Sequence, residues 1–315
     1  MGRLILKRLA FAVPMLFLVS FFSFVLVSLS PTDPARIVAG PYADEARVLE
    51  VRTELGLDRP MITRYGSWVS RAVRGDFGTS ITFAQGVPVR SLLNSRVPTT
   101  VSTVAVSLLV VTIAGISLGV FSAVKGGSSG RAVSVFSLLG LAIPGFWLVL
   151  ILTQWFSVKW RLFPAIGFRG ITDSPTAWLR ALVLPVLAIS VGPIASMTKQ
   201  TRDSMLDALG KDFVRVMQAN GMPRRSVLYR HALKNAAIPL VTLLGINAVA
   251  LIGAAVVIEK IKAFDGLGSL AVDAAAGSDL PIVQGAVVYF CLFVIVIGLL
   301  VDISYSFLDP RVRVR

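Results

Sequence analysis

Residues 9–29 read LAFAVPMLFLVSFFSFVLVSL, and this stretch decides the class of fold. It has no charged residue over about 20 positions, the length that an α-helix needs to cross a bilayer core of roughly 30 Å. Arg3, Lys7 and Arg8 precede the stretch, as at the start of a signal peptide, but no Ala-x-Ala cleavage site follows it. We therefore expect an uncleaved transmembrane helix in residues 1–30.

The rest of the chain repeats this pattern. Of its 315 residues, 55% are hydrophobic and 15% are charged, whereas soluble domains carry about 25% charged residues. Length alone would allow two soluble domains. Five further apolar runs override that expectation, and they lie at about 99–123, 132–157, 182–201, 236–258 and 284–307. The sequence predicts an all-α integral membrane protein with about six transmembrane helices.

The third and fourth runs contain helix-breaking residues. Pro144 falls in the third run and Pro185 and Pro193 fall in the fourth. Membrane helices tolerate proline where neighbouring helices satisfy the freed backbone groups. In the second run, Gly115 and Gly119 have the small-xxx-small spacing that lets two helices approach closely, although apolar helices also show this spacing by chance.

Residues 31–98 differ from the runs, because they are rich in charges and prolines. Ile62, Tyr65, Trp68, Val69 and Ala72 recur there at helical spacing. We expect a small helical extracytoplasmic segment between the first two spans, too short to bury a large core alone. Residues 99–307 then form a five-helix transmembrane core with a cytoplasmic loop at 202–235, and 308–315 form a cytoplasmic tail.

Basic residues set the expected orientation. Six spans place both termini on one side, and the short loops and ends of that side carry 16 Lys and Arg against 6 on the other, with the long 31–98 segment left out. Basic residues concentrate in cytoplasmic loops. Both termini are therefore predicted to be cytoplasmic. The net charge of +14 follows from this topology and requires no nucleic acid partner.

Several kinds of chemistry lack the residues they need. Cys291 and His231 are the only cysteine and the only histidine, which excludes an intrachain disulfide and the usual metal spacings. No Gly-x-x-x-x-Gly-Lys-Ser/Thr loop is present, so we expect no ATP hydrolysis by this chain. Residues 126–130 fit Gly-x-Ser-x-Gly but read as a flexible turn between spans. No catalytic residue is assigned, and an enzyme is not expected.

Ionisable residues are nearly absent from the spans. Asp302 is the one acid clearly within an apolar run, and it lies near the cytoplasmic end, where it reads as a helix-end residue. Carriers driven by proton or ion gradients usually need acids inside the membrane. A stand-alone carrier is thereby disfavoured, although neutral oxygens can also bind sodium.

The long loop at 199–235 combines basic residues with a helical apolar pattern. Phe213, Val216, Met217 and Asn220 share one helical face, and Gly221 then ends the helix. A second short helix is predicted for residues 224–235. Two short helices joined at a glycine form a compact docking element, whereas an ordinary basic loop would explain the charge but not the apolar periodicity.

This loop resembles the coupling loop of the dipeptide/oligopeptide/nickel branch of ABC importer permeases. In the wider group the loop reads Glu-Ala-Ala-x-x-x-Gly, then nine residues, then Ile-x-Leu-Pro. Here Gly221 matches the glycine and Leu233 the leucine, but Arg215-Val216-Met217 replaces Glu-Ala-Ala and Lys234 stands where proline is usual. In the peptide branch the proline comes later, as Pro239 does.

The resemblance extends over nearly the whole chain. Motifs in the family's order are GDFGTS at 75–80, IPGF at 143–146, FPAIG at 163–167, GLG at 266–268, DLPIVQG at 279–285 and, at the end, Asp302-x-x-Tyr305-x-x-x-Asp309-Pro310-Arg311. One departure lies after the fifth span, where Lys262 and Asp265 replace an aromatic residue and a proline. Inferences about that outer loop are therefore left open.

The resemblance implies a type I ABC importer permease fold in the bacterial plasma (inner) membrane. It implies a second related permease subunit, two cytoplasmic ATPase subunits that bind ATP and magnesium, and an extracytoplasmic solute-binding protein that delivers a peptide. No cofactor is expected on this chain itself. The residues expected to couple to the ATPase are Arg215, Val216, Met217, Gln218, Ala219, Asn220, Gly221, Met222, Arg224 and Arg225.

Polar residues inside the spans are candidates to line the pathway, namely Ser102, Thr103, Ser107, Gln154, Thr242 and Asn247. Serine and threonine in membrane helices also bond their own backbone or bridge helices. Nickel or another small solute in the same family is the alternative substrate. A stand-alone carrier and an intramembrane enzyme are the alternatives of other classes.

Overall fold

The computed structural model describes residues 2–30 and 32–308, which are helical over most of their length. The chain divides into two compact units. Unit 1 comprises Met1–Ile5, Val101–Ala263 and Val296–Arg315, and unit 2 comprises Leu6–Thr100 and Phe264–Ile295. The all-α class predicted from the sequence is confirmed.

Within the described residues, five continuous helices are long and apolar enough to cross a membrane. They cover Ala10–Ser28 of helix α1 (Gly2–Ser28), α5 (Val89–Lys125), α8 (Pro175–Leu209), the continuous stretch Arg224–Ile261, and α13 (Leu280–Leu308). A bent pair of helices makes a sixth candidate span. The prediction of about six spans is confirmed, and each expected apolar run falls on one of these elements.

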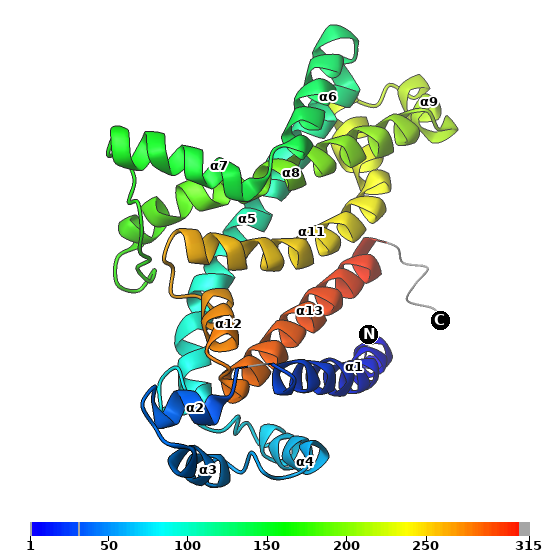
Figure 1. Cartoon of the computed structure of the whole chain (residues 1–315). Coiled ribbons are helices and arrows are strands. Elements are labelled where there is room, and N and C mark those ends of the chain that lie inside the picture. The colour runs from blue at the N-terminus through cyan, green and yellow to red at the C-terminus, as the bar shows by residue number, and fades with distance from the viewer. Residues whose placement is uncertain (1, 31, 309–315) are drawn as a thin grey trace. The chain divides into compact units, whose positions relative to one another are not determined.

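The third apolar run is broken, which differs from the single span expected at 132–157. It forms α6 (Gly127–Ala142) and α7 (Gly145–Leu152), and the two helices of the broken span bend by 93° between Ala142 and Gly145 (Figure 1). Ile143 is extended because a residue that precedes proline is disfavoured in the helical region. Pro144 then caps α7, which continues into a π-helical turn, η1 (Thr153–Lys159).

Proline has the opposite outcome in α8. Pro185 and Pro193 both lie within this uninterrupted 35-residue helix, and Pro185 is buried. Small apolar clusters surround it in unit 1, where Val149 of α7, Ala188 and Ile189 of α8, and Leu251 of α11 (Leu233–Ile261) pack together. Packing between neighbouring helices therefore holds α8 straight enough to stay continuous.

Gly115 and Gly119 lie where α5 approaches α8 within unit 1. A Cβ atom added at Gly115 would lie 2.6 Å from the Cβ of Met197, and one at Gly119 would lie 2.4 Å from the Cβ of Thr201. Only glycine fits at that separation. The small-xxx-small spacing therefore marks a true close approach of two helices.

Unit 2 contains the segment expected outside the membrane. Its helices are α2 (Pro34–Ala39), α3 (Glu45–Glu54) and α4 (Met61–Ala72), and the side chains of Asp33 and Asp44 cap the first two. α5 begins at Val89, ten residues before the apolar run that predicts it, because Pro98 does not interrupt the helix.

The core of unit 2 joins residues far apart in the sequence. Trp68 and Phe77 pack with Leu93 of α5, Leu270 of α12 (Leu267–Ala276) and Ile282 of α13. Segment 31–98 therefore does not depend on its own small core, as its length predicts.

Two family motifs meet in unit 2. The Asp279 carboxylate accepts hydrogen bonds through Oδ2 from the Ser80 hydroxyl at 2.6 Å and from the backbone N–H groups of Ile81, Thr82 and Phe83 at 2.9, 2.9 and 3.0 Å. Its other oxygen accepts from the N–H of Ile282 at the start of α13. We call this arrangement the Asp279 clasp. It ties the loop after residue 79 to the first turn of α13.

Candidate functional site

The coupling segment predicted from the sequence begins with a short amphipathic helix, α9 (Asp212–Ala219), in unit 1. Val214 is buried, whereas Val216 is 58% exposed, and Met217 is partly buried. One apolar residue thus anchors the helix to its own unit while another faces outward.

Gly221 ends α9 in the geometry of a Schellman motif. Its φ is +73°, the N–H of Gly221 donates to the carbonyl of Gln218 at 3.0 Å, and the N–H of Met222 donates to the carbonyl of Met217 at 3.0 Å. This motif places the residues at the positions of Met217 and Met222 beside each other. The left-handed backbone explains why glycine occupies position 221.

The chain is continuously helical after this turn, which corrects one expectation. A separate short helix was predicted for residues 224–235, but α10 (Arg224–Ser226), the π-helical turn η2 (Val227–Ala232) and α11 form one stretch of 38 residues. No glycine or proline occurs between Arg224 and Ala237 to end the helix. The π-helical turn is the only irregularity before the apolar part of α11.

The polar residues of the coupling segment are mostly exposed. Arg215, Arg224 and Arg225 are all exposed, and Arg215 lies 3.6 Å from Asp212 in an exposed ion pair. Exposed pairs of this kind contribute little free energy, so Arg215 remains available for another carboxylate. Gln218, Ala219 and Asn220 are also exposed. The residues predicted to couple therefore lie together on one short segment.

The six candidate pathway residues differ in burial. Thr103 and Ser107 of α5 and Asn247 of α11 are buried, and the Nδ2 of Asn247 has no hydrogen-bond partner within the described residues. Gln154 of η1 and Thr242 of α11 are exposed, and Ser102 is partly buried. The hydroxyl of Thr242 bonds the Ile238 carbonyl and the hydroxyl of Tyr305.

Further polar groups lie on α8, where sequence analysis assigned none. The hydroxyls of Thr198 and Thr201 are buried without a hydrogen-bond partner in the described chain. Thr201 faces Gly119, so the glycine spacing of α5 was the signal that this face of α8 is enclosed. Native structures seldom leave buried hydroxyls unsatisfied, and such groups suit water or a polar ligand.

Both departures from the family motif now have a structural role. The Nζ of Lys262 is buried in unit 1, where it donates to the carbonyl of Pro164 at 3.0 Å and lies 3.4 Å from the hydroxyl of Thr153. Burial lowers the pKa of Lys262 to about 8. In unit 2, Asp265 forms an ion pair with Arg96 at 3.1 Å.

Family comparison decides the class of this protein. Residues 115–314 match the family described as binding-protein-dependent transport system inner membrane component, and residues 1–104 match the N-terminal family of the same membrane component. The chain belongs to this permease family. The resemblance inferred from the coupling loop and the scattered motifs is thereby confirmed.

Curated relatives match this permease over its whole length. A probable peptide ABC transporter permease protein, y4tP, of Sinorhizobium fredii is 38% identical and is covered completely, with 99% of this chain. The oligopeptide transport system permease protein AppB of Bacillus subtilis is 34% identical over the same shares. The glutathione transport system permease protein GsiC of Escherichia coli K12 is 36% identical over 99% of both chains.

A solved structure shows the same fold. An inward-facing conformation of the MetNI methionine ABC transporter contains a chain that matches 70% of this permease and 97% of its own length, with a TM-score of 0.58 and 18% identity. The likeness supports the type I ABC importer permease fold that the sequence predicts. It carries no inference about the solute.

Proposed function

We propose that this chain is the permease subunit of an ATP-driven importer and forms half of a translocation pathway for di- or oligopeptides. The full-length similarity to relatives named for peptide, oligopeptide and glutathione transport carries this proposal. Glutathione is itself a small peptide, so the three names share one chemical class. Nickel or another small solute is the alternative within the family.

α9 and the Gly221 turn are proposed to bind a groove on a cytoplasmic ATPase subunit. Val216 offers an exposed apolar side chain, and Met217 and Met222 offer adaptable ones. Arg215, Arg224 and Arg225 are proposed to pair with carboxylates of the ATPase.

Continuity of the following helix supports a mechanical role for this segment. Movement of the turn at Gly221 would pass through Met222 and Pro223 into Arg224–Ile261, which is helical without interruption. Ala232 and Ala236 of that helix pack with Met205 of α8 and Val120 of α5. ATP-driven closure of two ATPase subunits would thus move three membrane helices of unit 1. This movement would open a central cavity to each side of the membrane in turn.

Partners and orientation complete the proposal. Two ATPase subunits hold ATP and magnesium, an extracytoplasmic binding protein delivers the solute, and a second related permease forms the other half of the pathway. This chain binds no cofactor and catalyses no reaction of its own. Both termini are cytoplasmic, as the basic loops indicate, and segment 31–98 lies outside. The candidate pathway residues remain those named from the sequence.

The test uses the complex recovered with a tagged chain from its own genomic context. Recovery of ATPase subunits, a second permease and a solute-binding protein supports the proposal. Recovery of the chain alone, in a monodisperse preparation, supports a stand-alone carrier. The reconstituted complex is then supplied with binding protein and with a dipeptide, a longer peptide, glutathione or nickel, and the solute that stimulates ATP hydrolysis identifies the substrate class.

Charge reversal tests the coupling segment. We expect Arg215→Glu to abolish most solute-stimulated ATP hydrolysis and uptake. Arg169→Glu is the matched control, because Arg169 is equally exposed in unit 1 but lies far from α9 in the sequence. If Arg215→Glu, and also Gly221→Pro, leave stimulated hydrolysis and uptake at the level of the control, the assignment of α9 is wrong.

A further inference from the structure

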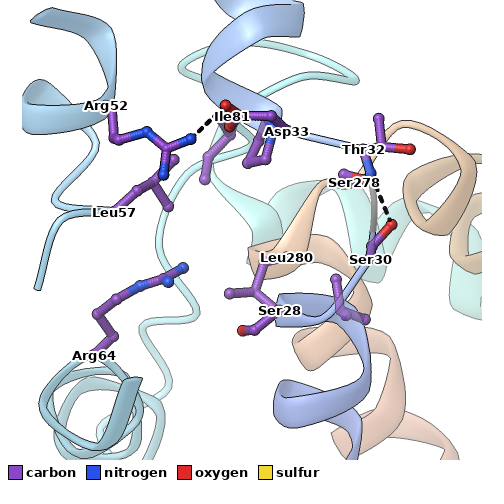
Figure 2. A pocket seen from close by; sticks show the side chains of 12 residues that line it. Ser28, Ser30, Thr32, Asp33, Arg52, Leu57, Arg64, Ile81, Ser278 and Leu280 are labelled. Carbon is purple, nitrogen blue, oxygen red and sulfur yellow. Dashed lines mark hydrogen bonds and ion pairs between the residues drawn. The ribbon is translucent and has the colours of Figure 1, made fainter. Parts of the chain in front are cut away.

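Unit 2 contains a cavity of about 280 Å³ that the transport mechanism does not use. Its wall is built by the end of α1, the start of α2, α3, α4 and the residues that precede α13 (Figure 2). The residues that matter for its chemistry are Ser28, Asp33, Arg52, Arg64, Ser278 and Leu280.

The cavity carries one uncompensated positive charge. Arg52 forms an ion pair with Asp33 at 2.6 Å, and Asp33 also caps α2 through the N–H of Ala35 at 3.0 Å, so this carboxylate is satisfied. Arg64 has no carboxylate partner among residues 2–30 and 32–308, and its guanidinium lies 5.6 Å from the centre of the Phe24 ring. Burial and the charge of Arg52 lower the pKa of Arg64.

Two hydroxyl groups of the cavity wall also lack a partner. Ser278 is 3% exposed, and neither its Oγ nor that of Ser28 forms a hydrogen bond with any described residue. Figure 2 shows Arg64 extending from α4 toward the side of the cavity formed by Ser28 and Leu280. Both hydroxyl oxygens are enclosed by the wall and do not face the cavity space, so the open guanidinium of Arg64 is the group that a ligand can reach. A guanidinium without a carboxylate partner in a cavity indicates an anionic ligand with acceptor oxygens.

The position of the cavity along the spans identifies the kind of anion. The apolar span of α1 ends at Ser28 and α13 begins at Leu280, and both residues line the cavity. The ends of membrane-spanning helices lie at the depth of the lipid headgroups. Phosphate is the anionic group present at that depth in every phospholipid, and arginine binds phosphate through two parallel hydrogen bonds.

We propose that this cavity binds the phosphate group of a membrane phospholipid, held by Arg64. Arg52 and Asp33 form the neutral side of the site and fix its shape. The acyl chains would lie along the apolar part of α1, where Leu26 and Phe22 are exposed. The bound lipid would join α1 to α4 and α13 within unit 2, independently of which solute is carried.

Lipid binding to the full-length chain tests this proposal. The delipidated chain in mild detergent is titrated with short-chain phosphatidylglycerol, and bound lipid is counted by native mass spectrometry. Loss of one charge-assisted contact should weaken binding about tenfold in Arg64→Gln. Arg64→Lys should bind more tightly than Arg64→Gln but less tightly than the wild-type chain, because lysine keeps the charge and loses the two parallel hydrogen bonds.

Arg71→Gln is the matched control, since Arg71 lies on the same helix but is exposed and outside the cavity. Equal affinities of the Arg64→Gln and Arg71→Gln variants would overturn the proposal, as would equal binding of a diacylglycerol that lacks phosphate. If inorganic phosphate competes at the same concentration as the lipid, the ligand of the cavity is a free anion and not a lipid headgroup. If Arg64→Gln does not fold, the wild-type chain still decides, because equal affinities for phosphatidylglycerol and for the diacylglycerol overturn the site.

Discussion

Replacing Asp279 with asparagine probes the Asp279 clasp in unit 2. The wild-type carboxylate is fully buried, and a single oxygen accepts from one hydroxyl and three backbone N–H groups within 2.6–3.0 Å. Asparagine keeps the shape and one acceptor oxygen but removes the negative charge. Its amide N–H₂ group would also face the N–H of Ile282, which the second carboxylate oxygen now accepts.

The size of the effect follows from the number and kind of these bonds. A hydrogen bond to a charged group contributes about 1.5–3 kcal/mol, against about 0.5–1.5 kcal/mol for a neutral one. Several donors share one oxygen, so their losses do not add in full. We expect Asp279→Asn to lower the free energy of opening of residues 75–88 by about 2–4 kcal/mol.

Limited proteolysis measures this opening. Arg74 and Arg90 flank the loop and become cleavable by trypsin when it detaches from α13. Where opening and closing are fast, the cleavage rate follows the open population, so we expect an increase of about 30- to 700-fold.

Asp76→Asn is the control for this measurement. It is the same substitution in the same loop, but Asp76 is exposed and accepts one hydrogen bond, from the N–H of Gly78 at 2.8 Å. It should change the cleavage rate little. Equal rates for the two variants would refute the idea that the clasp holds this loop.

Three further predictions concern unit 1. Gly119→Ala should lower the free energy of unfolding of the detergent-solubilised chain by about 1–3 kcal/mol, because the new Cβ would lie 2.4 Å from that of Thr201. Gly253→Ala is the control, since nothing lies within 4 Å of its new Cβ. Equal melting temperatures of the two variants would exclude a tight approach of α5 and α8. Gly221→Ala should lower the free energy of unfolding by about 1 kcal/mol, because alanine resists the φ of +73° at this position. It should also reduce solute-stimulated ATP hydrolysis without loss of assembly. Unchanged hydrolysis would show that the turn tolerates this strain. The pKa of Lys262 is about 8 in the folded chain, below its value in the unfolded chain. The unfolded chain therefore binds more protons between these two values, and the stability of the wild-type chain relative to Lys262→Met should rise as pH increases from about 8 to 10. A constant difference in melting temperature over this range would contradict the prediction.

Features that depend on a single helix or turn could be predicted from the sequence. The C-terminus of α9 was placed correctly because Gly221 supplies a positive φ that other residues resist, and the spans were found because uncharged runs of sufficient length are rare outside membranes. The separate helix at 224–235 was predicted wrongly for the converse reason. A helix does start at Arg224, as predicted, but no local feature ends it at Asn235.

The sequence by itself determined that this chain crosses a membrane, about how often, and to which family of permeases it belongs, because apolar run lengths and ordered motifs are properties of the linear chain. Tertiary structure alone decided that Asp279 receives the loop at 80–83, that Lys262 is buried against Pro164, and that Ser28, Arg64 and Ser278 share one cavity. Each of these pairings joins residues about 30 to 250 positions apart. Such contacts depend on how helices pack, and no local periodicity encodes which distant side chains will meet.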